Sequence, residues 1–564
     1  MKYSILCFFA CISLAFSAMA VENTDANLVV NNQYDFDRIS SNVNSAIKSG
    51  KRNITIDIKP GEYAFKNRHL LLKPDCTGVT VNIVGQGAKL YGCGENVSKS
   101  VDYNSSHIKD ATPVDLWGAV MQMSELISVV DADAKLCKAK MPAGCVAEAG
   151  DLVQVSQWYE TSVYEVKKVS GGYLYFIADD LRRIKSAQEW SVNYDYIYGK
   201  AFPRMRVFKS HLANTRIYEC QTCNFLTISG NNLKSVTVQG LTFIGNSYSN
   251  SDSVIRVNGL SSGSVTIQNC VFDGCASECV SVVKSKNVHV RDCDFSNNAV
   301  SCVYADNWSS NISVESCHFA NNGTRWSNFK TIIMSCQDFY VGNNVMCNSY
   351  YAFIGVGVWL GHKCNVPVSG IVEKNEMYYT QDFFDRYKEY TLMDSGAIYT
   401  WTQNDDVAIR YNRIHDYIGM KDNRGIFCDD GTRNVKIYGN VITNIPNSYC
   451  IDLRACPSVE SEAKRPIGKV NVGNLVRDNI VDGTVRFEGR KGGNNGCVKG
   501  KNIVVVPEGA QLPKMKVKDL DKAMDDVYVP GVVEKDGTIL ISRKAYNKVK
   551  SSSEYNEMKQ WIRK

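Results

Sequence analysis

The sequence lacks a long hydrophobic run, a strong charge of one sign and a zinc-type spacing of cysteine and histidine. Beyond residue 20 no stretch reaches the roughly 18 apolar residues of a membrane-spanning helix. The net charge is only +6 over 564 residues, and Lys and Arg are interspersed with Asp and Glu, so no nucleic-acid-binding stripe is expected. Beyond the first 20 residues, the single CxxC, Cys220 to Cys223, has no second pair at zinc spacing. We interpret it as a local disulfide or two packed thiols.

The first 20 residues have the pattern of a cleavable secretory signal. Lys2 is followed by an apolar run from Ile5 to Phe16 and by the small-x-small site Ala18-Met19-Ala20. The run is too short to span a bilayer. The sequence therefore predicts export to the periplasm or the outside of a bacterial cell.

One position recurs nine times down the chain, mostly as Cys or Asn, inside segments such as VTIQNCVF and VKIYGNVI. The nine residues are Leu241, Cys270, Cys293, Cys317, Asn344, Asn375, Asn412, Asn440 and Asn479. Their spacings are 29, 23, 24, 27, 31, 37, 28 and 39 residues. Such a period indicates a repeat architecture, and coils of 23 and 24 residues are too short for a βαβ unit of roughly 30 residues. The predicted fold is all-β, a right-handed parallel β-helix whose coils stack at about 4.8 Å.

The recurring position is predicted to be structural. Inward-facing thiols pack as small apolar groups, and stacked Asn amides bond to one another and to the turn. Cys7 and Cys11 lie in the signal segment, which leaves 19 of the 21 cysteines. Because that count is odd and Cys270, Cys293 and Cys317 follow the repeat, we expect reduced thiols in the core rather than a disulfide framework.

Composition shifts divide the chain. Residues 34–50 are predicted to form one amphipathic helix, closed by Gly50, that caps the open end of the coils. Residues of about 100–215 abandon the repeat and contain alternating strand-like pieces. The predicted organisation is a signal peptide 1–20, an N-terminal cap with the first coils 21–99, an inserted antiparallel β subdomain 100–215, the main β-helix with a catalytic groove 216–507, and a C-terminal extension or cap 508–564.

A second strand of each coil carries aromatic and acidic side chains on its outer face. Alternation places Tyr399 and Trp401 of IYTW outside, and Asp429 of IFCD outside as well. Counting back from the repeat puts Asp306, Trp401 and Asp429 in one exposed column. Rings and carboxylates together are typical of a carbohydrate site.

Three aspartates are the predicted catalytic groups: Asp394, Asp429 and Asp430. Glycoside hydrolysis needs one protonated and one ionised carboxyl, and adjacent coils are one strand spacing apart, so these acids could meet. Crowding of Asp429 with Asp430 could raise one pKa. Alternatively, Asp430 belongs to a turn and Asp394 caps a loop.

The remaining candidates for substrate contact surround this site. Asp452 and Arg454 face outward in IDLR, and His362 follows Trp359 one coil before Asp394. His415 could orient a sugar hydroxyl, or could form a turn pair with Asp416. Long insertions between Asn375 and Asn412 and between Asn440 and Asn479 are places where binding loops are common.

Three segments carry a family resemblance: DSGAIYTW from Asp394, NRIHD from Asn412 and GIFCDDGTRNVKIYGN from Gly425. They are similar to segments of β-helical glycoside hydrolases of the pectate-lyase-like superfamily, which include β-xylosidases, α-L-fucosidases and α-1,3-galactosidases. The resemblance covers roughly residues 35–95 and 225–507. It implies two catalytic acids on neighbouring coils, at Asp394 and at Asp429 or Asp430. The β-xylosidases have a glutamate as the second acid, and this sequence has only aspartates there.

The leading hypothesis is therefore an exported, exo-acting glycoside hydrolase that takes a carbohydrate substrate without metal or cofactor, as a monomer or weak homo-oligomer. A carboxyl separation of about 5–5.5 Å between Asp394 and Asp429 or Asp430 would imply retention, and about 6.5–9.5 Å inversion. One alternative is a polysaccharide lyase with an Arg or Lys base and Ca²⁺ held by Asp429 and Asp430. Another is a glycan-binding solenoid without catalysis.

Overall fold

The computed structural model describes most of the coil region. The described residues are 25–92, 113–115, 127–178, 204–208, 224–358, 366–383, 395–454, 473–487, 497–506 and 532–542, apart from short gaps inside these ranges. Four predictions lie outside them: the signal peptide, the pair Cys220 and Cys223, most of the C-terminal extension 508–564, and most of the two long insertions. No described helix is long and apolar enough to cross a membrane.

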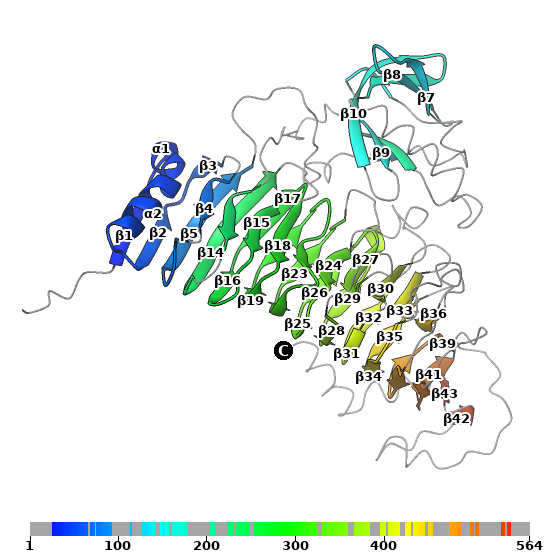
Figure 1. Cartoon of the computed structure of the whole chain (residues 1–564). Helices are drawn as coiled ribbons and strands as arrows, with labels where there is room; N and C mark the ends of the chain where they lie inside the picture. Colours follow the sequence, from blue (N-terminus) through cyan, green and yellow to red (C-terminus); the bar gives the residue numbers. More distant parts are fainter. Residues whose placement is uncertain are drawn as a thin grey trace, which may run out of the picture.

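Parallel strands build two long sheets that share the coils (Figure 1). Sheet A has 25 strands. They are β1 (Asp25–Val30), β2 (Asn53–Ile58), β3 (Glu62–Ala64), β5 (Thr80–Tyr91), β14 (Ser235–Asn246), β16 (Ser264–Gln268), β17 (Val271–Cys275), β19 (Lys286–Arg291), β20 (Asp294–Ser296), β22 (Ser310–Glu315), β23 (His318–Ala320), β25 (Phe339–Gly342), β26 (Val345–Cys347), β28 (Val368–Glu373), β29 (Glu376–Tyr378), β31 (Asn404–Arg410), β32 (Arg413–His415), β34 (Val435–Tyr438), β35 (Val441–Thr443), β37 (Leu475–Arg477), β38 (Ile480–Val481), β40 (Val498–Lys499), β41 (Asn502–Val506), β42 (Val532–Lys535) and β43 (Thr538–Ser542).

Sheet B has 11 strands and carries the predicted site. They are β4 (Leu70–Leu72), β13 (Leu226–Ser229), β15 (Ser253–Asn258), β18 (Glu278–Val283), β21 (Val303–Ala305), β24 (Lys330–Met334), β27 (Ala352–Val356), β30 (Ser395–Thr400), β33 (Asn423–Cys428), β36 (Tyr449–Leu453) and β39 (Thr484–Phe487). A coil contributes one strand to sheet B and two to sheet A, as β18, β19 and β20 do. Equivalent strands of successive coils pair in parallel, as β16 with β19, β17 with β20 and β18 with β21 do, which confirms the predicted parallel β-helix. Strand β42 differs, because it pairs antiparallel with β43.

The recurring Cys/Asn position lies at the bend between the two sheet A strands of a coil. The residue before it always has a left-handed backbone, with φ between +51° at Asn269 and +68° at Gly240. This conformation costs about 1–3 kcal/mol in a residue other than glycine, so the surrounding contacts must hold it. Asn412 shows how: its Nδ2 donates to the carbonyl of Arg410, across the strained Tyr411 (φ +55°).

The asparagines of the bend form one continuous hydrogen-bonded ladder. Each Nδ2 donates to Oδ1 of the next asparagine at 2.9–3.0 Å, and each backbone N–H donates to the same oxygen at 3.0–3.1 Å. The ladder runs from Asn344 to Asn479 as predicted and continues to Asn502, which the sequence count missed. All these side chains are buried.

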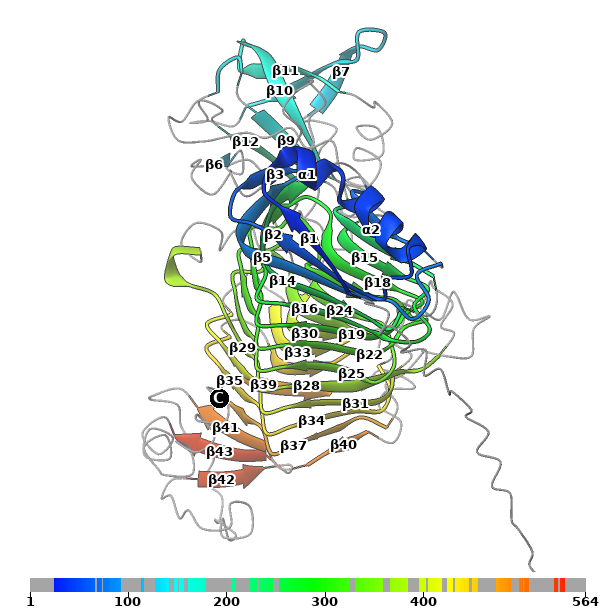
Figure 2. The same cartoon turned by 90° about the vertical axis from the view of Figure 1, so that its left-hand side faces the viewer.

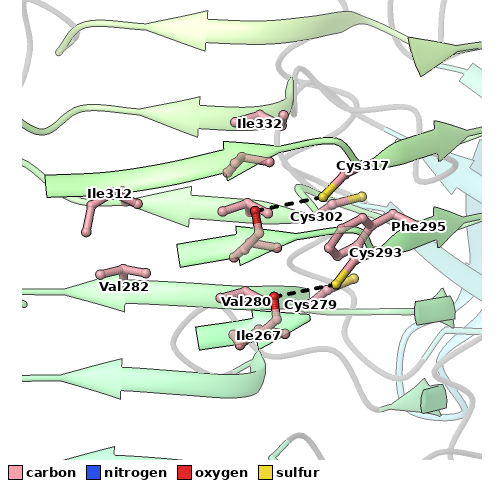
Figure 3. Close-up of a cluster of buried hydrophobic side chains, with 14 of the residues drawn as sticks. Ile267, Cys279, Val280, Val282, Cys293, Phe295, Cys302, Ile312, Cys317 and Ile332 are labelled. Atoms are coloured by element: carbon pink, nitrogen blue, oxygen red, sulfur yellow. Dashed lines mark hydrogen bonds between the residues drawn. The ribbon is translucent and has the colours of Figure 1, made fainter. Parts of the chain in front are cut away.

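Thiols occupy the earlier bends and point into the core (Figure 3). Cys270, Cys293 and Cys317 are free and buried, as predicted, and their Sγ atoms donate to backbone carbonyls. Beside them Phe243, Phe272, Phe295 and Phe319 stack ring on ring with centroids 4.7–4.9 Å apart. Such pairs contribute roughly 0.5–1.5 kcal/mol each beyond their burial.

The N-terminal end of the coils is covered by two short helices rather than the single helix predicted. Helix α1 (Gln33–Asp37) ends at Arg38, whose φ of −102° and ψ of 0° break the run before α2 (Ile39–Lys48) begins. Phe36 and Val43 are buried against the first coils, whose outermost strand, β1, was not predicted. Figure 2 shows both helices over this end of the molecule.

The predicted antiparallel insertion is present as a sheet of seven strands. They are β6 (Pro113–Asp115), β7 (Ile127–Asp131), β8 (Leu136–Lys140), β9 (Leu152–Ser156), β10 (Thr161–Ser170), β11 (Tyr173–Ile177) and β12 (Arg204–Phe208). All of its pairings are antiparallel. The exact boundaries of the five predicted domains stay predictions.

Candidate functional site

The outer face of sheet B, on strands β24 to β39, is the candidate site. Strand register aligns five residues of successive coils there: Gly355, Tyr399, Phe427, Asp452 and Arg486. The inward neighbours on these strands, including Ile398 and Ile426, are fully buried in the core. The predicted alternation of inward and outward side chains is therefore correct for these strands.

A second outward column passes through Asp306, Trp401 and Asp429, as predicted. Their backbone N–H groups donate to Val282, Val356 and Thr400 at 3.0, 2.9 and 3.0 Å, which are equivalent bonds in different coils. The expectation that this column is open to solvent is wrong for Asp429, which is only 5% exposed. The reason is that rings from neighbouring coils cover it.

Asp429 is held by a phenol. The hydroxyl of Tyr399, one coil earlier, donates to Asp429 Oδ2 at 2.6 Å. This distance is typical of a strong hydrogen bond between a hydroxyl and a charged oxygen. Behind it, Thr432 Oγ1 donates to the backbone carbonyl of Asp429 at 2.9 Å. Tyr399 thus orients the carboxylate, and Thr432 holds the backbone that carries it.

Lys330, which the sequence reasoning missed, lies in a cage of three rings. Its Nζ is 4.2 Å from the ring centroid of Trp401, 5.0 Å from that of Tyr351 and 5.1 Å from that of Tyr399. Its exposed fraction is 5%, and lysine is rarely so buried. A charged residue inside an otherwise apolar strand, KTIIM, was the signal that could have identified it.

Gly355 makes room for this cage. A Cβ atom added there would lie 2.9 Å from the Trp401 ring and 3.0 Å from Lys330 Cγ. The column therefore has its smallest residue where a ring and a cation must lie close over the strand. This close approach is the reason that glycine is required at this position.

The neighbouring coils carry a buried charge cluster. Asp452 is fully buried and accepts from Arg424 Nε at 2.9 Å and from Arg486 Nε and Nη2 at 2.7 and 2.6 Å. The Arg424 guanidinium lies 4.0 Å from the Phe427 ring centroid, and that of Arg486 lies 3.9 Å from the ring centroid of Tyr449. Asp452 was predicted to be exposed for substrate contact. Its burial between two guanidinium groups corrects that exposure and gives it a positioning role.

Two other predicted contacts have structural partners. Asp306 Oδ1 accepts from Lys284 N, Trp308 N and Ser309 Oγ, so it caps the turn after β21. His415 lies on β32 of sheet A rather than on sheet B, with Nδ1 2.7 Å from Asp416 and Nε2 3.2 Å from Glu376. These contacts favour the turn-pair alternative for His415.

A second acidic group lies nearer the N-terminal end of sheet B. Burial raises the pKa of Glu278 on β18 to about 7, although Arg256 acts in the opposite direction. Burial and the carboxylates of Asp306 and Glu278 raise the pKa of Tyr304 to about 12. With this pKa, the Glu278 carboxyl is partly protonated at neutral pH, and it lies outside the site at Asp429.

Four predicted site residues lie outside the described residues: Asp394, Asp430, Trp359 and His362. The predicted meeting of Asp394 with Asp429, and a catalytic role of Asp394, stay predictions.

The described residues contain no group of three or more His, Cys, Asp or Glu that could hold a metal ion. Arg454, the last predicted contact, is half-buried, and its backbone N–H donates to Cys428 O, which aligns it with Asp429 of the preceding coil.

Together these observations define the class: a parallel β-helix with a buried acid, ring and cation site on one outer face. No family profile matches the sequence, and no curated protein matches it. Solved structures with similarity include one titled "Glycoside hydrolase", with 13% identity, 86% of this chain and 96% of that chain covered, and a TM-score of 0.49.

Two other solved structures are also similar. The Azotobacter vinelandii mannuronan C-5 epimerase AlgE4 A-module has 10% identity, covers 85% of this chain and 91% of its own, and has a TM-score of 0.38. PfbA, a surface adhesin of Streptococcus pneumoniae, has 10% identity, covers 84% and 83%, and has a TM-score of 0.34. Because all three scores are below 0.5, the fold assignment rests on the strand pairing described above.

Proposed function

We propose that the chain is an exported carbohydrate-active enzyme that hydrolyses glycosidic bonds at the outer face of sheet B. The observation that carries the proposal is the buried Asp429 carboxylate, bonded to Tyr399 and lying in the same column as Trp401. A purely structural coil has no need of a buried acid on its outer face. Desolvating a carboxylate is costly, and the fold bears this cost here without any gain in core packing.

The chemistry of the site suits a sugar. Trp401 is partly exposed and packs edge to face on the buried Tyr399 ring at 5.0 Å, so it presents a ring on which the C–H face of a pyranose can pack. Asp429 supplies a carboxyl that can transfer a proton or stabilise a developing oxocarbenium ion. Asp430, the next residue in the sequence, is the candidate for the second carboxyl. No metal or cofactor is part of the proposal.

Substitution of the aspartates tests the proposal. Asp429→Asn should lower the rate of reducing-sugar release roughly a thousandfold, because removing a general acid or base usually costs a hundredfold to ten-thousandfold. Asp430→Asn should lower it similarly. Asp394→Asn tests the other predicted candidate for the second carboxyl. The matched control is Asp294→Asn, an exposed aspartate of sheet A that should retain full activity.

Full activity of Asp429→Asn on every glycan that the unmodified protein cleaves would refute the proposal. If oligosaccharides bind but none is ever cleaved, the non-catalytic solenoid is correct. The unfolding midpoint of each variant separates a lost fold from lost chemistry.

A polysaccharide lyase is the second candidate, and Lys330 is the observation that favours it. The Lys330 ammonium beside Tyr399 could neutralise a uronate carboxylate while Tyr399, as a phenolate after passing its proton to Asp429, takes the proton from the neighbouring carbon. The C–O bond to the leaving sugar then breaks, a carbon–carbon double bond forms, and the proton on Asp429 passes to the leaving oxygen. Products with ultraviolet absorbance from a new carbon–carbon double bond would establish the lyase. A saturated monosaccharide as product would exclude it.

A further inference from the structure

The inserted antiparallel sheet has two different faces in the half formed by β10, β11, β8 and β7, which neighbour one another in that order. One face is apolar, and its side chains, including Cys137, Leu174 and Phe176, are fully buried. Because side chains alternate between the two faces of a strand, Tyr173 and Tyr175 leave β11 on the opposite face. In both views of the molecule this half of the sheet projects away from the coils (Figures 1 and 2). The outer face is not needed for the core of the sheet, so its two rings need a separate explanation.

Three lysines surround the two tyrosines on this outer face. Lys138 on β8 and Lys168 on β10 are the register partners of Tyr175, one on each side of it. Lys140 is the register partner of Tyr173. Neighbouring strands lie about 4.8 Å apart and alternate residues of one strand about 7 Å apart, so the three lysines start within roughly 12 Å of one another. We call these five residues the lysine–tyrosine face.

The rings hold two of the ammonium groups in place. Lys138 Nζ is 4.9 Å from the ring centroid of Tyr173, and Lys168 Nζ is 5.7 Å from that of Tyr175. Both rings are half-buried, so they are themselves held by the sheet. Attraction to an aromatic ring positions a cation without cancelling its charge, whereas a carboxylate would cancel it. The ammonium groups are therefore positioned and still charged.

No carboxylate neutralises these lysines within the described part of the chain. None of the three forms an ion pair with a described residue, although Lys167, which precedes Lys168, does: its ammonium lies 2.8 Å from Glu165 Oε2. Lys140 and Lys168 are exposed to solvent. The lysine–tyrosine face thus presents cations that an external anion can reach.

We infer that the lysine–tyrosine face binds an acidic polysaccharide, one that carries carboxylate or sulfate groups, at a site separate from Asp429. Ammonium groups bind oxyanions through charge-assisted hydrogen bonds. The tyrosine rings between them offer apolar surface, and their hydroxyls offer hydrogen bonds, to the sugar that carries the charge. The inference does not rest on the proposed function, because it concerns a different surface and requires no cleavage.

The size of the group favours a polysaccharide over two other polyanions. Proteins that bind duplex DNA often contact about 6–10 phosphates, because the duplex carries one charge per ~1.7 Å. Anionic membrane surfaces recruit clusters of about 4–8 basic residues. Three lysines spread over roughly 12 Å suit a polymer of lower charge density.

Calorimetric binding to three oligosaccharides of equal length tests the inference: an oligogalacturonate, a sulfated galacto-oligosaccharide and a neutral galacto-oligosaccharide. The protein is the full chain with Asp429→Asn, so that no probe is consumed. We expect at least one acidic probe to bind about tenfold more tightly than the neutral one at low salt. The preference should shrink at about 0.5 M NaCl, because salt screens exposed charges. The carboxylate and sulfate arms identify which anion is taken.

The double variant Lys138→Gln/Lys168→Gln, added to that protein, identifies the site. It should lower acidic-probe binding about tenfold and leave neutral-probe binding unchanged. The matched control is Lys89→Gln/Lys436→Gln, which removes two ammonium groups of sheet A, each 51% exposed, and so changes the net charge equally. It should change neither value. Tyr175→Leu keeps an apolar side chain but removes the ring between the lysines, and it should lower acidic-probe binding about threefold.

Equal binding of acidic and neutral probes, or binding of none, would overturn the inference. Equal losses in the double variant and in its control would also overturn it, because net charge alone would then explain the binding. Tighter binding to duplex DNA or to phosphatidylserine vesicles than to either acidic probe would do the same, since another polyanion would be the ligand. The unfolding midpoint of each variant shows whether its fold is retained.

The proposed function has a separate readout, which is cleavage by the unmodified protein. If acidic probes bind at the lysine–tyrosine face and no glycan is cleaved, the inference stands and the hydrolase proposal fails. If glycans are cleaved and the lysine variants bind every probe as the unsubstituted face does, the inference fails and the hydrolase proposal stands.

Discussion

The bend of each coil and the outer face of sheet B are both columns of stacked residues, and they differ in what is repeated. Down the bend the same residue recurs, from Asn344 through Asn502, and each bonds to the next. Down the outer face, the residue changes at nearly every coil, as in Gly355, Tyr399, Phe427, Asp452 and Arg486. In the repeated column, each side chain hydrogen-bonds to the same residue type in the next coil. In the non-repeating column, each side chain needs a different partner from another coil. We therefore expect stability to depend on the first and function on the second.

The largest expected loss of stability lies on the outer face, where it would run against this comparison. Asp452→Asn should lower the free energy of unfolding by about 4 kcal/mol, because it leaves the buried guanidinium of Arg424 without a counter-charge. Urea unfolding followed by circular dichroism measures it. Asp406→Asn, which breaks the exposed pair with Lys436, should cost less than about 1 kcal/mol. If the two variants are equally stable, the charge cluster has no role in holding the outer face together.

The ladder gives the next largest effect. Asn412→Ala should cost about 3 kcal/mol, because Asn375 loses the acceptor of its side-chain and backbone N–H groups in a buried setting. The same urea experiment applies, with the exposed Asn53→Ala as control, which should cost less than about 0.5 kcal/mol. A cost for Asn412→Ala no greater than that of the control would show that the repeated column is not what stabilises the coils.

The smallest expected effect is a pH dependence of stability that comes from one residue of sheet B, Glu278. The unfolded chain releases the Glu278 proton near the ordinary pKa of 4.5, while the folded chain keeps it to about 7. Stability should therefore fall as pH rises through this window. The full shift corresponds to about 3.4 kcal/mol, and because the Glu278 side chain is only partly buried, solvent screening should reduce the fall to about 2 kcal/mol.

Glu278→Gln should remove that slope, so its unfolding midpoint relative to the unmodified protein should be higher at pH 7.5 than at pH 4.5. The exposed Glu62→Gln serves as control and should leave the slope in place. An identical pH dependence in the unmodified protein and Glu278→Gln would mean that Glu278 titrates normally.

Features set by local pattern were predictable from the sequence. The spacing of Cys293, Cys317 and Asn344 predicted the coils, and period-two alternation predicted that Ile398 and Ile426 point inward. The ladder ended one residue too early in the prediction, because Asn502 follows KGKN and lacks the usual apolar lead-in. The break between α1 and α2 was missed because it depends on the backbone of Arg38 and not on hydrophobic spacing.

The site was predicted only in part, and the reason is physical. Alternation predicts to which side of a strand a side chain points, but not whether side chains of other coils bury it. Asp429 is buried by Tyr399 and its neighbours, and Asp452 by two arginines that lie 28 and 34 residues away in sequence. Lys330 was missed because the three rings of its cage come from the two coils that follow its own strand.

The ladder has a direction. From Asn344 to Asn479, each side-chain amide donates to the next asparagine on the C-terminal side and also to a backbone carbonyl on the N-terminal side. The amide-to-amide bonds therefore all run in one direction, head to tail. A coil can therefore be added or removed as a whole unit without reversing any bond, provided that its asparagine stays in place. Insertion or deletion of a coil would thus preserve the hydrogen bonds of every bend. The same change would shift the outer-face residues relative to one another.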